Sequence, residues 1–130
     1  MSSSKQVIRT EDAPAPFQGA PYNQAVASGG FVFVSGQLGL QPGETALPEG
    51  IEAQTRQVLA NLTTILKAAG SGPEHVVKTT VFLKDLGDFA AMNELYKGFA
   101  GSEAPARSTI QVAKLPSDAL IEIEAIARIP

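Results

Sequence analysis

The stretch Val76 to Lys84, with the sequence VVKTTVFLK, decides which fold class the chain can adopt. It is rich in β-branched residues and also holds an aromatic residue, a composition typical of a β-strand. Alternation gives it apolar groups on both faces, with Val77, Thr79, Val81 and Leu83 on one and Val76, Lys78, Thr80 and Phe82 on the other. A sheet built around such a strand needs cover on both sides.

Helices are predicted on both sides of this strand in the sequence. Apolar residues recur at helical spacing from about Ile51 to Ala69, and Gly70 is placed as a C-terminal cap. A second helix is expected from Asp88 to Phe99, with Asp88 at its start. Its apolar stripe consists of Phe89, Met92, Tyr96 and Phe99.

Four more strands are expected in the remaining sequence. The run Phe31 to Val34 is predicted to be a buried strand that forms a hairpin with about Gln24 to Ala27, through Ser28-Gly29-Gly30. The last two strands, about Arg107 to Ala113 and Ala119 to Arg128, flank a turn at 114–118. This order predicts one α+β domain over residues 1–130, a mixed sheet with two helices on one face. Because the other face would be apolar and uncovered, we expect a homo-oligomer.

Composition excludes several classes of protein. The chain has 130 residues, 44% hydrophobic and 18% charged, which is typical of a folded domain. Cysteine is absent, which excludes disulfides, thiolate metal sites and a cysteine nucleophile. The segment Met1 to Pro16 lacks the pattern of a secretory signal, and no run approaches the ~20 apolar residues of a membrane helix, so we expect a cytoplasmic protein with no membrane partner. A net charge of −3 and scattered basic residues argue against a nucleic-acid partner.

Polar residues are concentrated on the two C-terminal strands. Alternation places Arg107, Thr109 and Gln111 on one face of the first strand, and Glu122 and Glu124 on one face of the second. If these strands pair through the turn so that Ala113 faces Asp118, Thr109 lies opposite Glu122 and Arg107 opposite Glu124.

This cluster has two interpretations. One is a cross-strand ion pair on a solvated sheet face. The other is a small hydrolytic site, because an arginine fork binds a carboxylate through two hydrogen bonds and a nearby carboxylate can take a proton from water.

Several short motifs occur together, in the order that a known family has them. They are Pro21-Tyr22, Ser35-Gly36-Gln37, Val77-Lys78-Thr79-Thr80-Val81, Lys84-Asp85-Leu86, Asn93, Pro105-Ala106-Arg107-Ser108, Leu115-Pro116 and Ile121-Glu122-Ile123-Glu124-Ala125. In this order the chain resembles the RidA/YjgF family of reactive-intermediate deaminases over nearly its whole length.

The resemblance implies a chorismate-mutase-like homotrimer with an inner β-barrel and ligand clefts between neighbouring subunits. It implies hydrolysis of enamines and imines, such as 2-aminoacrylate, to 2-oxo acids and ammonia without a cofactor. Arg107 would bind the substrate carboxylate and Glu122 would activate water. The residues implied to line the cleft are Tyr22, Ser35, Gly36, Asn93 and Thr109.

Three positions depart from the family pattern and affect what the resemblance implies. Ala20 precedes Pro21 where glycine is common, and Asn23 follows Tyr22 where serine is frequent, so the loop can have another shape and another substrate preference. Thr109 stands where some relatives have cysteine, so a thiol takes no part in the chemistry of this chain.

Other assignments remain open at this point. Glu124 competes with Glu122 for the role of base, and a regulatory trimer that binds a small carboxylate would need Arg107 but not Glu122. Ribonuclease and chaperone labels have been attached to relatives. The acidic pI of about 5.1 and the single histidine, His75, count against RNA cleavage, and the lack of cysteine and acidic metal-binding spacing counts against a metal site.

Overall fold

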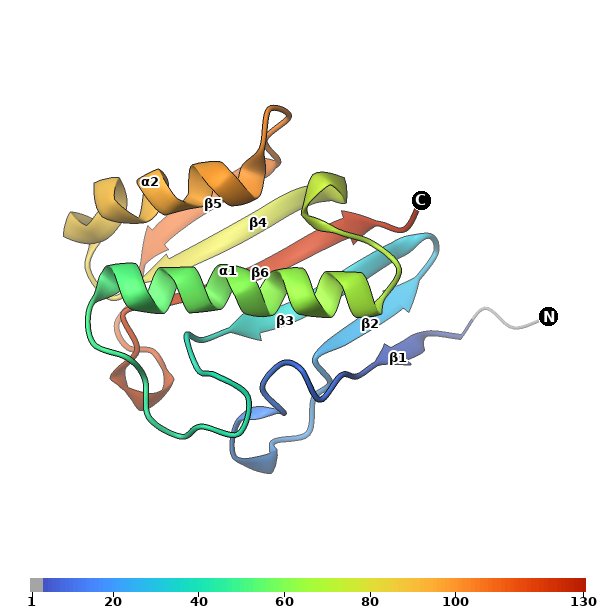
Figure 1. Cartoon of the computed structure of the whole chain (residues 1–130), viewed down its shortest axis with the longest axis horizontal. Coiled ribbons are helices and arrows are strands. Elements are labelled where there is room, and N and C mark those ends of the chain that lie inside the picture. Colours follow the sequence, from blue (N-terminus) through green and yellow to red (C-terminus); the bar gives the residue numbers. More distant parts are fainter. Residues whose placement is uncertain (1–3) are drawn as a thin grey trace.

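A computed structural model describes residues 4–130, in which two helices cover one face of a six-stranded sheet (Figure 1). The helices are α1 (Ile51–Ala68) and α2 (Phe89–Ala100). The strands are β1 (Gln6–Ile8), β2 (Ala25–Ser28), β3 (Phe31–Gln37), β4 (Val76–Leu83), β5 (Ala106–Gln111) and β6 (Ile121–Arg128). The segment Met1 to Pro16, in which no secretory signal was expected, begins with residues 1–3, and these three lie outside the described residues.

The strand order is β1-β2-β3-β6-β4-β5, with β4 and β5 parallel and the other neighbours antiparallel. The mixed α+β sheet with both helices on one face is therefore confirmed. The edge strand β1 was not among the expected elements, because three residues are too short to give a pattern.

The hairpin of β2 and β3 follows from its turn. Ser28 pairs with Phe31, and the two residues between them, Gly29 and Gly30, have φ values of 62° and 85°. Two consecutive positive φ angles are the requirement of a tight type I′ turn, which glycine meets without strain. The buried strand expected here is buried on one face: Val32 and Val34 lie in the core, while Phe31 and Phe33 are 40% and 46% exposed.

Both helices form where periodicity predicted them. The α1 helix ends in a Schellman motif: the Gly70 N–H donates to the Lys67 carbonyl (3.0 Å) and the Ser71 N–H to the Leu66 carbonyl (2.9 Å). Gly70 has φ of 82°, so the predicted glycine cap is confirmed. Asp88 stands at the start of α2, but its side chain makes no capping bond.

The core lies between the helices and the sheet. Its fully buried side chains come from both helices and three strands: Val32, Val58, Leu62, Ile65, Leu66, Val81, Leu83, Met92, Ile121 and Ile123. A register shift between Val76 and Lys78 changes the expected alternation of β4. In a regular strand Val77 would share the buried face of Thr79. Because of the shift, Val76 is buried instead and Val77 is 39% exposed.

The expected hairpin of the last two strands is wrong. Strand β4 lies between them, with Arg107 beside Thr79 on one side and Glu122 beside Phe82 on the other. The reason is α2, which carries the chain back to the start of β4 and leaves β5 parallel to it on the sheet edge. The remaining open side of β4 accepts β6 after the 112–120 segment has passed the end of β4.

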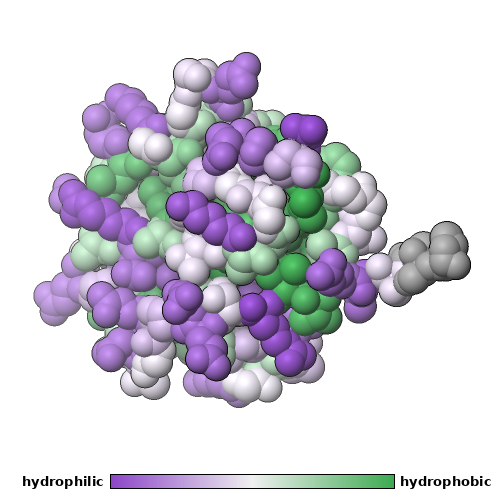
Figure 2. All heavy atoms as spheres, turned by 45° about the vertical axis from the view of Figure 1, so that its right-hand side comes forward, coloured by the Kyte–Doolittle hydropathy of each residue, from purple (hydrophilic) through white to green (hydrophobic). Residues whose placement is uncertain are grey.

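The face of the sheet opposite the helices carries uncovered apolar side chains. Ile110 and Phe33 are 45% and 46% exposed, and they align with Phe82 and Ile126 on neighbouring strands. On the face drawn in Figure 2, hydrophilic side chains are scattered among apolar ones. Among residues 4–130, no helix has the length and apolarity needed to cross a bilayer.

Leu62 gives a direct test of this core. Its side chain is fully buried in α1, so Leu62→Ala should lower the free energy of unfolding by about 3 kcal/mol, through lost burial and the cavity left behind. Urea denaturation monitored by circular dichroism measures the change. Arg56→Ala, on the exposed side of the same helix, is the control and should change stability by less than about 0.5 kcal/mol; equal effects would contradict the assigned helix orientation.

Candidate functional site

Several residues implicated by the sequence meet in one cavity at the Gly36 end of β3. Its volume is about 430 Å³. The lining consists of Phe17, Ala20, Tyr22, Ser35, Gly36, Leu38, Pro116, Glu122 and Glu124. Tyr22, Ser35, Gly36 and Glu122 were expected there, whereas Phe17 and Pro116 had been given no role.

Backbone contacts hold the mouth of this cavity in shape. The Ser35 hydroxyl donates to the Asn23 carbonyl (2.6 Å), which joins β3 to the loop before β2. The Tyr22 hydroxyl accepts a hydrogen bond from the Phe17 N–H (2.6 Å). Tyr22 thus fixes the loop with its hydroxyl and, at 40% exposure, offers its ring to the cavity.

The Glu122 carboxylate packs closely against Gly36. A Cβ atom at position 36 would overlap the Glu122 carboxylate, so this carboxylate lies directly against the bare Cα of Gly36. Glycine permits this close approach, and a larger residue would require the Glu122 side chain to shift. The glycine therefore creates the space in which Glu122 sits.

The environment of Glu122 favours its protonated form. Burial raises the pKa of this carboxyl, and the neighbouring negative charge of Glu124 raises it further. Glu124 itself is exposed, although it lines the same cavity. Glu122 therefore combines partial burial with a raised pKa, an environment that is common among functional carboxyls.

Arg107 lies elsewhere, on the helix-covered face of edge strand β5. Its guanidinium carbon stands 4.8 Å from the ring centre of Tyr96 and 5.5 Å from that of Phe89, both on α2. Its Nη1 atom contacts the Met92 sulfur at 3.9 Å. Within residues 4–130 no carboxylate pairs with Arg107, so most of its donors are available to a ligand.

The Tyr96 ring that lies against Arg107 is held in place by a hydrogen bond. The Tyr96 hydroxyl shares a hydrogen bond of 2.5 Å with the Thr79 hydroxyl on β4. Burial raises the pKa of Tyr96, against the lowering effects of that hydrogen bond and of the Arg107 charge. A neutral, fixed ring therefore lies under the guanidinium and limits the directions in which it can point.

Two more expected residues accompany Arg107 on the same elements. Asn93 is on α2 and Thr109 is on β5, two residues beyond Arg107 and on the same strand face. The Asn93 Oδ1 and Thr109 Oγ1 atoms are buried, and neither has a hydrogen-bond partner among the described residues. Buried polar atoms are nearly always paired in native proteins, so these two are suited to a further partner.

The expected cluster of Arg107 with Glu122 and Glu124 does not form within one chain. Arg107 aligns with Thr79, which faces the helices, whereas Glu122 aligns with Phe82, which faces the opposite side. The site residues therefore form two groups. We call them the guanidinium group (Arg107, Asn93 and Thr109) and the carboxylate group (Glu122, Tyr22, Ser35 and Gly36).

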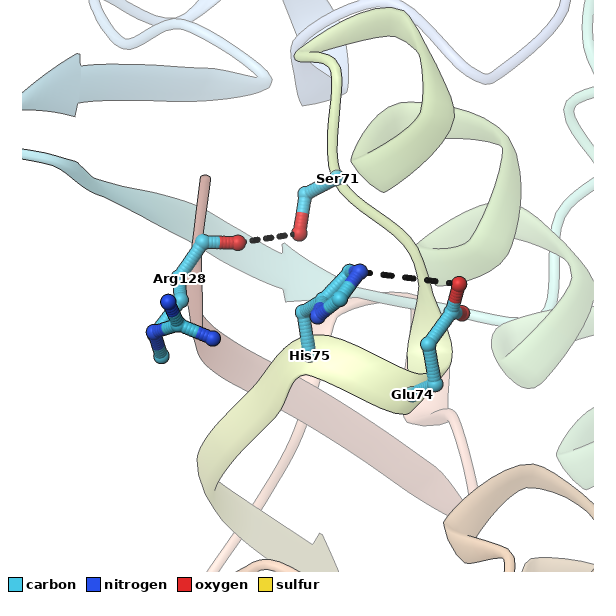
Figure 3. A network of polar contacts seen from close by, with 4 residues as sticks. All are labelled: Ser71, Glu74, His75 and Arg128. Carbon is cyan, nitrogen blue, oxygen red and sulfur yellow. Dashed lines mark hydrogen bonds and ion pairs between the residues drawn. The ribbon is translucent and has the colours of Figure 1, made fainter. Parts of the chain in front are cut away.

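His75 is remote from the carboxylate group. It ends a short 3-10 turn beside Val76, and Val76 pairs with Ala127 at the far end of β6 from Glu122. Figure 3 shows its Nε2 atom directed toward Glu74, at 3.6 Å from the carboxylate, while Ser71 donates to the Arg128 carbonyl (2.6 Å). The Ser71 bond ties the α1–β4 connection to the end of β6, whereas the contact of His75 with Glu74 stays within that connection.

Among residues 4–130, no cluster of three or more histidine, cysteine, aspartate or glutamate side chains is arranged to hold a metal ion.

The chain is similar to known proteins in both sequence and structure. A family model described as Endoribonuclease L-PSP matches residues 10–129. The chain is 52% identical over 128 residues to a RutC family protein of Synechocystis, covering 96% of this chain and 97% of that one. It is 47% identical over 125 residues to the 2-iminobutanoate/2-iminopropanoate deaminase of Salmonella typhimurium, covering 94% and 96%. A structure of E. coli TdcF with bound serine superposes with a TM-score of 0.89 at 42% identity, covering 95% of this chain and 98% of that one.

The raised pKa of Glu122 can be measured by carbon-13 NMR titration of its carboxyl group. We expect a value above that of an ordinary glutamate. Glu124→Gln should lower it, because the like charge is removed, without restoring the ordinary value, because burial remains. An unchanged Glu122 pKa in that variant would show that the two charges do not interact.

The same pKa shift determines how stability depends on pH. A carboxyl that binds its proton more tightly when folded contributes stability below its unfolded pKa and loses it as pH rises through the folded pKa. Glu122→Gln should therefore be more stable relative to wild type at pH 7 than at pH 3 in urea denaturation.

Proposed function

The chain belongs to the RidA/YjgF family, and from this premise we propose that it hydrolyses reactive imines of amino acids to 2-oxo acids and ammonia. The observation that carries the proposal is the pair of complementary groups described above. One presents an unpaired guanidinium suited to a carboxylate, and the other presents a half-buried carboxylate suited to proton transfer.

The two groups can act together only if they come from different copies of the chain. They lie on opposite faces of one sheet, and the carboxylate group shares its face with exposed apolar side chains. Association through that face would bury Phe33 and Ile110. We therefore propose a homotrimer in which the sheets face inward as a barrel and each cleft joins the guanidinium group of one subunit to the carboxylate group of the next.

The proposed reaction requires these residues to bind the substrate and to transfer protons. Arg107 binds the carboxylate of the imine through paired hydrogen bonds, with Asn93 and Thr109 beside it as further polar contacts. An enamine such as 2-aminoacrylate first tautomerises to this imine. Glu122 then takes a proton from water as the oxygen adds to the imine carbon, and it passes this proton to the nitrogen to give a carbinolamine.

Collapse of the carbinolamine completes the proposed cycle. Glu122 takes the proton of the hydroxyl group and passes it to the nitrogen, which leaves as ammonia while the carbon–oxygen bond becomes a carbonyl, so that imine plus water gives 2-oxo acid plus ammonia. A raised pKa suits a carboxyl that must both accept and donate. This uncatalysed reaction is already fast, so acid–base assistance of about 10²–10⁴-fold is sufficient, and the scheme uses no cofactor.

A non-catalytic trimer that binds small carboxylates is the second candidate. The unpaired Arg107 favours it, and the E. coli TdcF structure with bound serine is a relative that holds a small carboxylate. In that case Glu122 would be dispensable for binding. RNA cleavage, the activity in the name of the family model, is supported less well, because His75 lies at the far end of β6 from Glu122 and no second histidine exists.

Activity measurements separate the two candidates. With 2-aminoacrylate generated by a serine dehydratase, wild type should accelerate pyruvate release, and Arg107→Ala and Glu122→Gln should each reduce the acceleration at least about 10²-fold. His75→Gln is the matched control and should keep wild-type activity. If wild type has no effect on small or bulky imines but binds a 2-oxo acid through Arg107, the carboxylate-binding role is the better account.

A mixing experiment tests the shared cleft. Arg107→Ala and Glu122→Gln are co-expressed with different tags, and hybrid trimers are verified by analytical ultracentrifugation. If each cleft draws on two subunits, random hybrids restore one intact cleft in each mixed trimer, about one quarter of all clefts. If both residues served one chain, co-expression would restore no activity.

A further inference from the structure

A second cavity adjoins the one that holds Glu122. Its volume is about 330 Å³, and its lining includes Ala15, Leu40, Thr45 and Ser117. Phe17 lines both cavities, and consecutive residues of one turn, Pro116 and Ser117, line the first and the second respectively. The boundary between the two spaces is therefore the Phe17 side chain together with this turn.

Phe17 is held in place by contacts of both its side chain and its backbone. Its side chain packs against a small apolar cluster of Leu38, Leu40, Leu115 and Ala119, separate from the main core. Its N–H donates to the Tyr22 hydroxyl, and the turn that follows closes through the Ala20 N–H and the Phe17 carbonyl (3.1 Å). Gln18 in this turn has φ of 53°, a left-handed conformation that makes the segment sharply bent.

The facing turn at 116–118 is fixed as well. Ser117 and Asp118 both have φ of 55°, in the same left-handed region. Asp118 pairs with Lys84 at 2.9 Å, which links this turn to the end of β4. Two bent segments thus meet at the boundary, and Phe17 is the large side chain that they place there.

We propose that Phe17 determines substrate size by closing the catalytic cavity against the second one. This inference rests on the proposed function and assigns to Phe17 the limit on side-chain length, which favours imines with short side chains such as the one derived from alanine. A longer aliphatic or aromatic side chain would need the space beyond Phe17. The lining of that space includes the apolar residues Ala15, Pro16 and Leu40, which suit such a group, beside polar residues such as Glu44.

The test compares two substrates in the same protein. Imines are generated in situ by an amino-acid oxidase from alanine or from leucine, and 2-oxo acid release is measured above the uncatalysed rate. Phe17→Ala should raise the leucine-to-alanine ratio of kcat/KM about tenfold, since a pocket change of one or a few methylene groups discriminates by at least that factor. A ratio is independent of the fraction of protein that is active, so a partial loss of folding does not mimic the effect.

Two further variants show where the longer side chain goes. Thr45 lines the second cavity and not the first, so Phe17→Ala combined with Thr45→Phe should refill that space and return the ratio toward wild type. Thr45→Phe alone should leave alanine-imine hydrolysis unchanged. Phe17→Leu keeps an apolar barrier and should change the ratio less than Phe17→Ala.

The outcomes separate this inference from the proposed function. An unchanged ratio in Phe17→Ala, or a raised ratio that Thr45→Phe does not reverse, overturns the role of Phe17 while the deaminase proposal stands. If wild type accelerates neither imine, the proposed function itself fails.

Discussion

The position of β4 between β5 and β6 is the constraint on which the rest of the structure depends. Helix α2 returns the chain to the start of β4, so β5 must run parallel to β4 and form the sheet edge. The same crossover lays α2 over β5, which brings Tyr96 and Phe89 beneath the Arg107 guanidinium. It also leaves the other side of β4 to β6, whose alternation then turns Glu122 away from the helices.

The chemistry of the two groups follows from this arrangement. Arg107 gains a rigid aromatic support but no partner of opposite charge within residues 4–130. Glu122 gains a half-buried place beside Gly36 and a like charge nearby. Each group is incomplete by itself, a guanidinium without an anion and a carboxyl held toward its neutral form. A small acid that contains an imine is the kind of molecule that would complement both.

Local sequence patterns predicted the local parts of the fold. The spacing in α1, its cap at Gly70 and the Gly29-Gly30 hairpin each depend on neighbouring residues, and each is confirmed. The pairing of the last two strands was predicted by the same local logic and is wrong, because the partner of β5 is set by a crossover far away in the sequence. The bulge at Val76 to Lys78 likewise depends on the opposite strand.

The site was predictable to a similar extent. The grouping of Tyr22, Ser35, Gly36 and Glu122 in one cavity agrees with the family resemblance, whereas alternation had placed Arg107 with Glu122 on one face. Phe17 gave no periodic signal, since it lies in a loop of prolines and glycines whose path is fixed by a hydrogen bond to Tyr22. Contacts of this kind depend on tertiary structure and are invisible in spacing.

The contact between Gly36 and Glu122 has a consequence for how such proteins diverge. Because a side chain at position 36 would occupy the volume of the carboxylate, the two positions are not free to mutate independently. A lineage that acquires alanine at 36 must first or simultaneously shorten or displace residue 122. Natural sequences should therefore show covariation between them, and a chain with a larger residue at 36 would hold its carboxylate in another place than this one.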